Sequence, residues 1–262
     1  MREASGSPGR ALHVRDRELR YPLGALFGAI VVWWLATLAL DIPPFLMPPP
    51  DAVFSQLLAN PVLYARNALF TLEKVAYGGS VGIAGGFCLA LGIAYLPWFR
   101  RAVYPYLVTA RVLPKIAIAP LFLIYLGTGM GTAVVFVALI AFFPIVLSTA
   151  AGLQKAPREY HDLLDSVDAG SLRKVVYVDL PYALPDIFAG LKQSVTLAVV
   201  GAVIAEWIVA DNGLGFVILL ASENVRTDIM LAALVVLVIE GLLLYGGVVL
   251  AQRAATRWSA VE

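Results

Sequence analysis

Several ionisable side chains stand inside long apolar runs, where residues of their types could bind a charged or polar solute. Arg111 and Lys115 are one helical turn apart on the same face of their run, and Glu206 lies near the end of a later run. An ionisable side chain at the centre of a bilayer costs about 2.5–3.5 kcal/mol on insertion scales, so each one needs a stabilising role. We expect Arg111, Lys115 and Glu206 to line a path for an anionic or polar solute. The alternative for Glu206 is an ion pair with a basic residue or a helix end, and Glu240 could be a buried hydrogen-bond partner.

Residues that would support other chemistry are sparse. The two histidines are far apart and the single cysteine, Cys88, sits in an apolar run, so the sequence predicts no metal site. No G-x-x-x-x-G-K-[ST] phosphate loop occurs, which indicates that this chain does not hydrolyse ATP. Asp162 and Asp165 fall on the polar face of a short helix. We expect neither an enzyme nor a bound cofactor, and the formal net charge of +1 gives no reason to expect a nucleic-acid partner.

The composition is typical of an integral membrane protein. Hydrophobic residues make up 60% of the 262 positions and charged residues 14%, whereas soluble domains have about 45–50% and about 25%. The mean hydropathy is +0.83. The first apolar run is too long for the core of a signal peptide and no cleavage pattern follows it, so we interpret it as a retained membrane anchor. The sequence predicts an all-α membrane protein.

Six apolar runs have the roughly 20 residues that a helix needs to cross the hydrocarbon core. They cover residues 21–40, 68–96, 104–126, 132–153, 186–209 and 229–250. Three prolines indicate that the third run is kinked. If the first run lies along the membrane surface, five spans remain. Between the first two runs, Asp51 can begin a short helix at the outer interface, and a loop is expected to separate the last two.

Three glycines repeat at four-residue spacing in the second run, namely Gly78, Gly82 and Gly86. In membranes, this spacing lets two helix backbones approach closely. We interpret the row as packing within the chain, in preference to a contact between two copies. Glu73 and Lys74 precede it and could form a local pair at the end of the span.

The basic residues gather on one side of the predicted spans. That side holds the five N-terminal arginines, Arg100, Arg101, Lys155, Arg158, Arg173, Lys174, Arg253 and Arg257, and the other side holds Arg66 and Arg226. Because cytoplasmic loops carry an excess of Lys and Arg, both termini are expected in the cytoplasm. The predicted organisation is a cytoplasmic tail at residues 1–20, a transmembrane domain at 21–252 and a second tail at 253–262.

The longest charge-mixed segment, residues 157–185, lies on the same side as the termini. Pro157 is suited to a helix start, where Glu159 would favour the positive end of the helix dipole. The apolar residues of this short helix share one face: Tyr160, Leu163, Leu164 and Val167. Ala169-Gly170 is expected to end it, Ser171 to cap a second helix over residues 172–178, and Leu180-Pro181 to end that one. The apolar stripe suits docking into a groove of a partner, and the alternative is a helix resting on lipid headgroups.

Residues 162–181 resemble the "EAA" loop of binding-protein-dependent ABC importer permeases, which has an acid, two alanines, a glycine and a Leu-Pro end. Asp162 and Leu180-Pro181 fit this pattern. Other segments resemble the nitrate, sulfonate and taurine branch, which also handles pyrimidine-type vitamin precursors: Phe45–Pro50, Leu113–Leu121, Glu206 and Gly213-Leu214-Gly215. Leu163 and Leu164 replace the alanines and Asp168 replaces the glycine, so we expect the bend at Ala169-Gly170 instead.

The resemblance implies a type I importer permease in the bacterial cell (inner) membrane, whose loop at residues 156–181 contains a coupling helix held by a separate ATPase subunit. The residues that it assigns to coupling are Glu159, Tyr160, Asp162, Leu163, Leu164, Val167, Asp168, Ala169, Gly170 and Pro181. It also implies a second permease copy as a homodimer, two ATPase subunits that use ATP and Mg²⁺, an external solute-binding protein, and nitrate, a sulfonate, taurine or a pyrimidine precursor as the solute. The rival hypotheses are a self-sufficient secondary transporter or channel, which should show inverted repeats, and a membrane enzyme.

Overall fold

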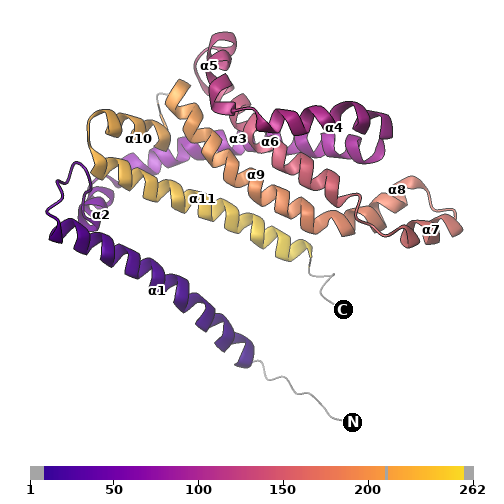
Figure 1. Ribbon diagram of the computed structural model, residues 1–262, viewed down its shortest axis with the longest axis horizontal. Coiled ribbons are helices and arrows are strands. Elements are labelled where there is room, and N and C mark those ends of the chain that lie inside the picture. The colour runs from indigo at the N-terminus through magenta and orange to yellow at the C-terminus, as the bar shows by residue number, and fades with distance from the viewer. Residues whose placement is uncertain (1–8, 210–211, 257–262) are drawn as a thin grey trace.

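The computed structural model describes residues 9–209 and 212–256, and every element in these two ranges is helical (Figure 1). The helices are α1 (Gly9–Ala39), α2 (Pro50–Ala59), α3 (Pro61–Tyr95), α4 (Pro97–Val112), α5 (Lys115–Leu126), α6 (Met130–Gly152), α7 (Arg158–Ser166), α8 (Ser171–Lys174), the π-helical segment η1 (Val175–Asp179), α9 (Leu180–Val209), α10 (Leu214–Glu223) and α11 (Thr227–Ala255). The prediction of an all-α membrane protein is confirmed.

Five helical segments are long and apolar enough to cross a membrane, and six spans result if α4 and α5 count as one. The kink predicted in the third run is a complete break, because the axes of α4 and α5 are bent by 101°. Leu113, at the break, has an extended ψ of 131°, since the ring of Pro114 disfavours helical backbone in the preceding residue. By length and composition, the count of five or six depends on whether the α4–α5 pair is one span, and the first run counts as a span in both cases.

Several helices extend beyond the predicted spans or lie where a loop was expected. Helix α1 begins at Gly9, inside the expected tail, and α11 continues to Ala255, beyond the expected end of the transmembrane domain. Residues 1–8 and 257–262 of the two predicted tails lie outside the described residues. The connection expected as a loop before the last span contains α10, a predominantly apolar helix of ten residues that packs on α11 and α9.

Helix α6 is the centre of the fold and makes its most extensive contacts with α9 and α3. The glycine row of α3 lies directly on it: a Cβ at Gly86 would be 2.5 Å from Cγ2 of Ile145, and one at Gly82 would meet the backbone of Ala138. Gly78 has a similarly close neighbour on α6. The row is therefore packing within the chain, as predicted.

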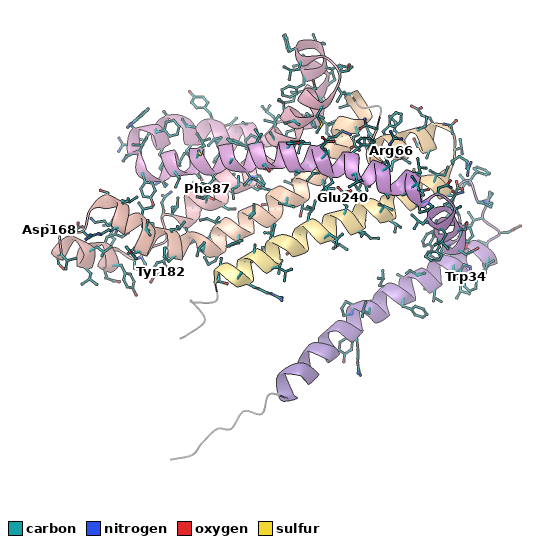
Figure 2. All side chains as sticks on the ribbon, turned by 180° about the vertical axis from the view of Figure 1, so that it is seen from behind. Trp34, Arg66, Phe87, Asp168, Tyr182 and Glu240 are labelled. Atoms are coloured by element: carbon teal, nitrogen blue, oxygen red, sulfur yellow. The ribbon has the colours of Figure 1, made fainter. Side chains whose placement is uncertain are left out.

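The arrangement in Figure 1 has two distinct ends. Helices α2 and α10 lie at one end, whereas the α3–α4 turn and helices α7 and α8 lie toward the other. Helix α1 runs away from the bundle and approaches the other helices only near α2. Figure 2 shows the same separation from behind, with Arg66 and Asp168 at opposite ends of the molecule.

Helix α7 ends in a Schellman motif, a left-handed turn with two characteristic hydrogen bonds. Asp168 has a φ of 50°. The Ala169 N–H donates to the Leu164 carbonyl oxygen at 2.9 Å and the Asp168 N–H to that of Asp165 at 3.1 Å. The bend thus lies at Asp168 and not at Ala169-Gly170 as predicted, because aspartate is one of the residues that tolerate this conformation.

The helix that begins at α8 continues through η1 into α9, so the prediction that Leu180-Pro181 ends a helix is wrong. Pro181 has no N–H to donate, and the turn before it is wider than an α-helical turn. There the Leu180 N–H donates to the Val175 carbonyl oxygen. The predicted cap at Ser171 is also wrong: Gly170 occupies the N-cap position and no side chain bonds there.

Candidate functional site

Arg111 and Lys115 line one cavity of about 390 Å³ between the α4–α5 break, α6 and α9. The break places the two residues on different helices, with Arg111 in the last turn of α4 and Lys115 at the first position of α5. Neutral polar groups from Ser148 and Gln193 and the ring of Phe143 also line the cavity. The structure therefore brings together the two basic residues that the sequence singled out.

The two cations in this cavity have no acidic partner among the described residues. The Lys115 ammonium lies 4.7 Å from the centre of the Phe143 ring and 3.4 Å from the Arg111 carbonyl oxygen, to which it donates. The Arg111 side chain is exposed. Two neighbouring positive charges in a concave, low-dielectric site attract an anion. Sequence reasoning missed Ser148 and Gln193, since neutral residues in an apolar run carry no distinctive signal.

Glu206 does not lie in this cavity. Its carboxylate is buried, and Oε1 forms an ion pair with the Lys74 ammonium at 2.9 Å. Oε1 also accepts a hydrogen bond from Thr71 at 2.9 Å, and Oε2 accepts one from the Gly215 N–H at 2.7 Å. Glu206 therefore forms an ion pair with a basic residue, which was the alternative to a place along the solute path. Lys74 accordingly pairs with Glu206 rather than with its neighbour Glu73.

The same network holds Asn212 and the residues at the start of α10. The Lys74 ammonium also donates to the Asn212 carbonyl oxygen at 2.9 Å and to its side-chain oxygen at 2.8 Å. Gly213 has a φ of 109°, and a Cβ there would overlap the Glu206 carboxylate. Glycine is required at this position both for its backbone angle and for space. The network ties α3 to α9 and to the start of α10.

Glu240 lies on α11 in the middle of the molecule (Figure 2). It is buried, and neither carboxylate oxygen has a hydrogen-bond partner among the described residues. The interhelical hydrogen bond considered for it is therefore not present. The described residues also contain no group of three or more His, Cys, Asp or Glu that could hold a metal ion.

The residues predicted to couple the chain to an ATPase occupy α7 and the turn after it, except for Pro181, which lies in the first turn of α9. Those that are exposed are Glu159, Tyr160, Asp162, Leu163, Val167, Asp168 and Gly170. Leu164 and Pro181 are half-buried, and Ala169 is buried. Leu163 and Val167 are 63% and 66% exposed, so they, and not Leu164, form the outward part of the apolar stripe.

The opposite face of α7 holds His161, for which the sequence suggested no partner. Its Nε2 lies 3.0 Å from Oδ1 of Asp179, in η1. The Tyr95 hydroxyl, at the end of α3, donates to the other carboxylate oxygen, Oδ2, at 2.9 Å. These three residues belong to three different elements, and Tyr95 is 84 positions from Asp179, so periodicity within one segment could not reveal them.

Comparison with known proteins gives a consistent result. The family model described as "Binding-protein-dependent transport system inner membrane component" matches residues 82–257. The chain is 31% identical over 235 residues to the riboflavin transport system permease protein of Chloroflexus aurantiacus, covering 88% of this chain and 87% of that protein. It is 30% identical over 263 residues to the taurine transport system permease protein of Escherichia coli, covering 94% and 95%.

The fold is also similar to that of a solved transporter. A chain in the inward-facing structure of the MetNI methionine ABC transporter matches with a TM-score of 0.65 and 21% sequence identity. The match covers 73% of this chain and 95% of the other. At this identity, the similarity concerns the arrangement of the helices.

Proposed function

Because the chain belongs to the family of binding-protein-dependent ABC transport permeases, we propose that it conducts a small anionic or polar solute through the cavity that Arg111 and Lys115 line. Family membership makes the chain a multi-pass membrane protein and a permease subunit rather than an enzyme. It also implies an ATPase and a solute-binding protein as partners.

One observation carries this proposal: two neighbouring cations without an acidic partner among the described residues share a cavity of about 390 Å³. Small-molecule sites are typically clefts of about 300–1,000 Å³ in which a few polar groups fix the orientation of the ligand. Arg111 and Lys115 would hold the anionic group, while Ser148 and Gln193 would offer neutral hydrogen bonds. The Phe143 ring would contact an apolar or aromatic part of the solute.

The substrate that we propose belongs to the classes named for the relatives. Those proteins include permeases for taurine, riboflavin and nitrate. The cations of this cavity would interact favourably with a sulfonate, taurine, nitrate or an electron-rich pyrimidine compound. The pair of cations favours an anion among them, because a neutral ring gains less from two positive charges than a sulfonate or nitrate does.

The assembly that we propose is a homodimer with two ATPase subunits that use ATP and Mg²⁺. Arg111 and Ile116 are exposed on the rim of the cavity, and a second copy there would close the path around the solute. Helix α7 would dock in the ATPase groove through Tyr160, Leu163 and Val167. The bias of basic residues supports cytoplasmic termini in the bacterial inner membrane.

The experiment compares Arg111→Gln and Lys115→Gln with the unchanged permease in proteoliposomes that contain the ATPase and the solute-binding protein. Uptake of labelled taurine, ethanesulfonate and nitrate is measured. Losing one charge-assisted hydrogen bond costs about 1.5–3 kcal/mol, so each substitution should lower uptake of the transported anion by about tenfold or more. Arg100→Gln is the matched control, since it removes a basic residue of α4 that does not line the cavity. Equal uptake by all three variants would exclude this path.

A further inference from the structure

Apart from the backbone at its two ends, helix α7 is held to the other described elements by contacts of side chains. None of its nine residues is buried, so it has no apolar core that would force it to move with the membrane helices. Its contacts are His161 with Asp179, Asp165 with Lys174, and the Tyr160 ring with the Tyr182 ring at 5.6 Å between centroids. A displacement of α7 by a docked protein must pass through these contacts or through the backbone.

One of these contacts leads through Asp179 to a helix outside the continuous helix that α8, η1 and α9 form. Lys174 and Tyr182 belong to that continuous helix, which already follows α7 in the chain. Asp179 differs because its second carboxylate oxygen accepts a hydrogen bond from Tyr95, the last residue of α3. The Asp179 side chain is 6% exposed. Its Oδ1 contacts His161, and its Oδ2 accepts the hydrogen bond from Tyr95.

The position of this carboxylate suits transmission between elements. A buried charged hydrogen bond is strong and directional, so its two partners hold a defined geometry. Asp179 lies in the π-helical turn before Pro181, a local irregularity of a kind that often accompanies functional sites. Helix α3, which Tyr95 terminates, packs through its glycines on the central helix α6. A displacement of Tyr95 would therefore be transmitted directly along α3 to its contact with α6.

We propose that Asp179 is a positioning residue that links the docking helix to α3 through His161 and Tyr95. The link transmits the displacement of α7 to the α3–α6 pair, in addition to the path along the α8–α9 helix. This inference rests on the proposed function, in which α7 docks on the ATPase.

The test measures coupling in the assembled transporter. Permease and ATPase are reconstituted in proteoliposomes, and ATP hydrolysis is measured with and without the solute-binding protein, isolated with its natural solute bound. Tyr95→Phe and His161→Ala each remove one end of the link. Each should lower the ratio of stimulated to basal hydrolysis about threefold or more, as expected for one hydrogen bond. Asp179→Asn should lower it as well.

Co-purification of the ATPase separates this inference from the proposed function. It should be unchanged in Tyr95→Phe and His161→Ala, because neither removes an outward residue of the apolar stripe, whereas Leu163→Asp should abolish it. Retained ATPase in Leu163→Asp would contradict docking through α7, independently of the link. Tyr106→Phe is the matched control, since this tyrosine is exposed and has no partner among the described residues.

The combination of the two substitutions decides whether they act through one residue. If His161 and Tyr95 act through Asp179, the double variant should be no worse than the more severe single variant, because residues in one network do not act additively. A stimulation ratio equal to the unchanged protein in either single variant would overturn the proposal. Independent effects that multiply in the double variant would also overturn it.

Discussion

The Lys74–Glu206 ion pair is the most enclosed ion pair among the described residues, with side chains 5% and 0% exposed. Each partner makes further hydrogen bonds, to Asn212 on one side and to Thr71 and Gly215 on the other. A buried pair of this kind contributes little net stability compared with a well-packed apolar pair, but removing one partner strands the other charge. The contact is therefore sensitive to single substitutions.

We predict that Lys74→Met and Glu206→Gln each lower the free energy of unfolding by about 3–5 kcal/mol, the usual cost of leaving one charge of a buried pair without its partner. The double variant should lose less than the sum of the two. Unfolding in mixed detergent and SDS micelles measures these differences. Glu73→Gln is the control, because the neighbouring acid is exposed. Additive losses in the double variant would show that the two side chains do not interact energetically.

At the residue scale, the sequence identified charged residues but not their partners. Arg111 and Lys115 lie close together in the sequence, and their common cavity could be anticipated from that spacing. Glu206 and Lys74 are 132 positions apart, and Tyr95 and Asp179 are 84 apart. Such pairs form only when helices pack, so the periodicity of one segment contains no information about them. The alternative of an ion pair for Glu206 came from the cost of burying a charge, not from a pattern.

At the element scale, the glycine row of α3 shows how sequence spacing determines helix packing. Gly82 meets the backbone of Ala138, which cannot move aside as a flexible side chain could. Gly85 is one position from the row and exposed, and a Cβ added there would have no neighbouring atom within 4 Å among the described residues. The two glycines are equally placed in the helix and differ only in the face that they occupy.

We predict that Gly82→Ala lowers the free energy of unfolding by about 1–3 kcal/mol, the usual cost of overpacking a close contact. Gly85→Ala should leave it unchanged or raise it by up to about 1 kcal/mol, because alanine favours helix more than glycine does. Thermal unfolding in detergent provides the comparison. A loss of equal size in both variants would indicate an effect of helix propensity or backbone rather than of α3–α6 packing.

The helices themselves were predicted well because apolar length and glycine spacing are local signals. The errors lie at two prolines and at one position where another residue replaces the expected glycine. Pro114 breaks the third run completely, since its predecessor Leu113 becomes extended, whereas Pro181 is absorbed by a π-helical turn. Asp168 takes the left-handed conformation that the expected glycine would have taken. The residue type alone does not determine whether a proline breaks a helix or is accommodated in it, or whether an aspartate adopts the left-handed conformation.

At the scale of the whole molecule, the helices divide the charged segments between two ends. The start of α4, which carries Arg100 and Arg101, lies toward the same end as α7 and α8 (Figure 1). Arg66 lies at the opposite end from Asp168 (Figure 2). The charge bias counted along the sequence is thus also a bias in space. Because positively charged segments stay on the cytoplasmic side during insertion, the end that holds α7 should face the cytoplasm, where an ATPase has access to it.

We predict that a thiol on α7 and a thiol on α2 react from opposite sides of the membrane. In a Cys88→Ser background, Ser55→Cys on α2 should react with an impermeant maleimide added to intact spheroplasts, and Ser166→Cys on α7 should react only after permeabilisation. Both serines are exposed, so their accessibility reports the side of the membrane rather than burial. A permeant maleimide should label both variants equally and serves as the control. Labelling of Ser166→Cys in intact spheroplasts would invert the orientation, placing α7 where no ATPase could dock and contradicting the coupling mechanism as a whole.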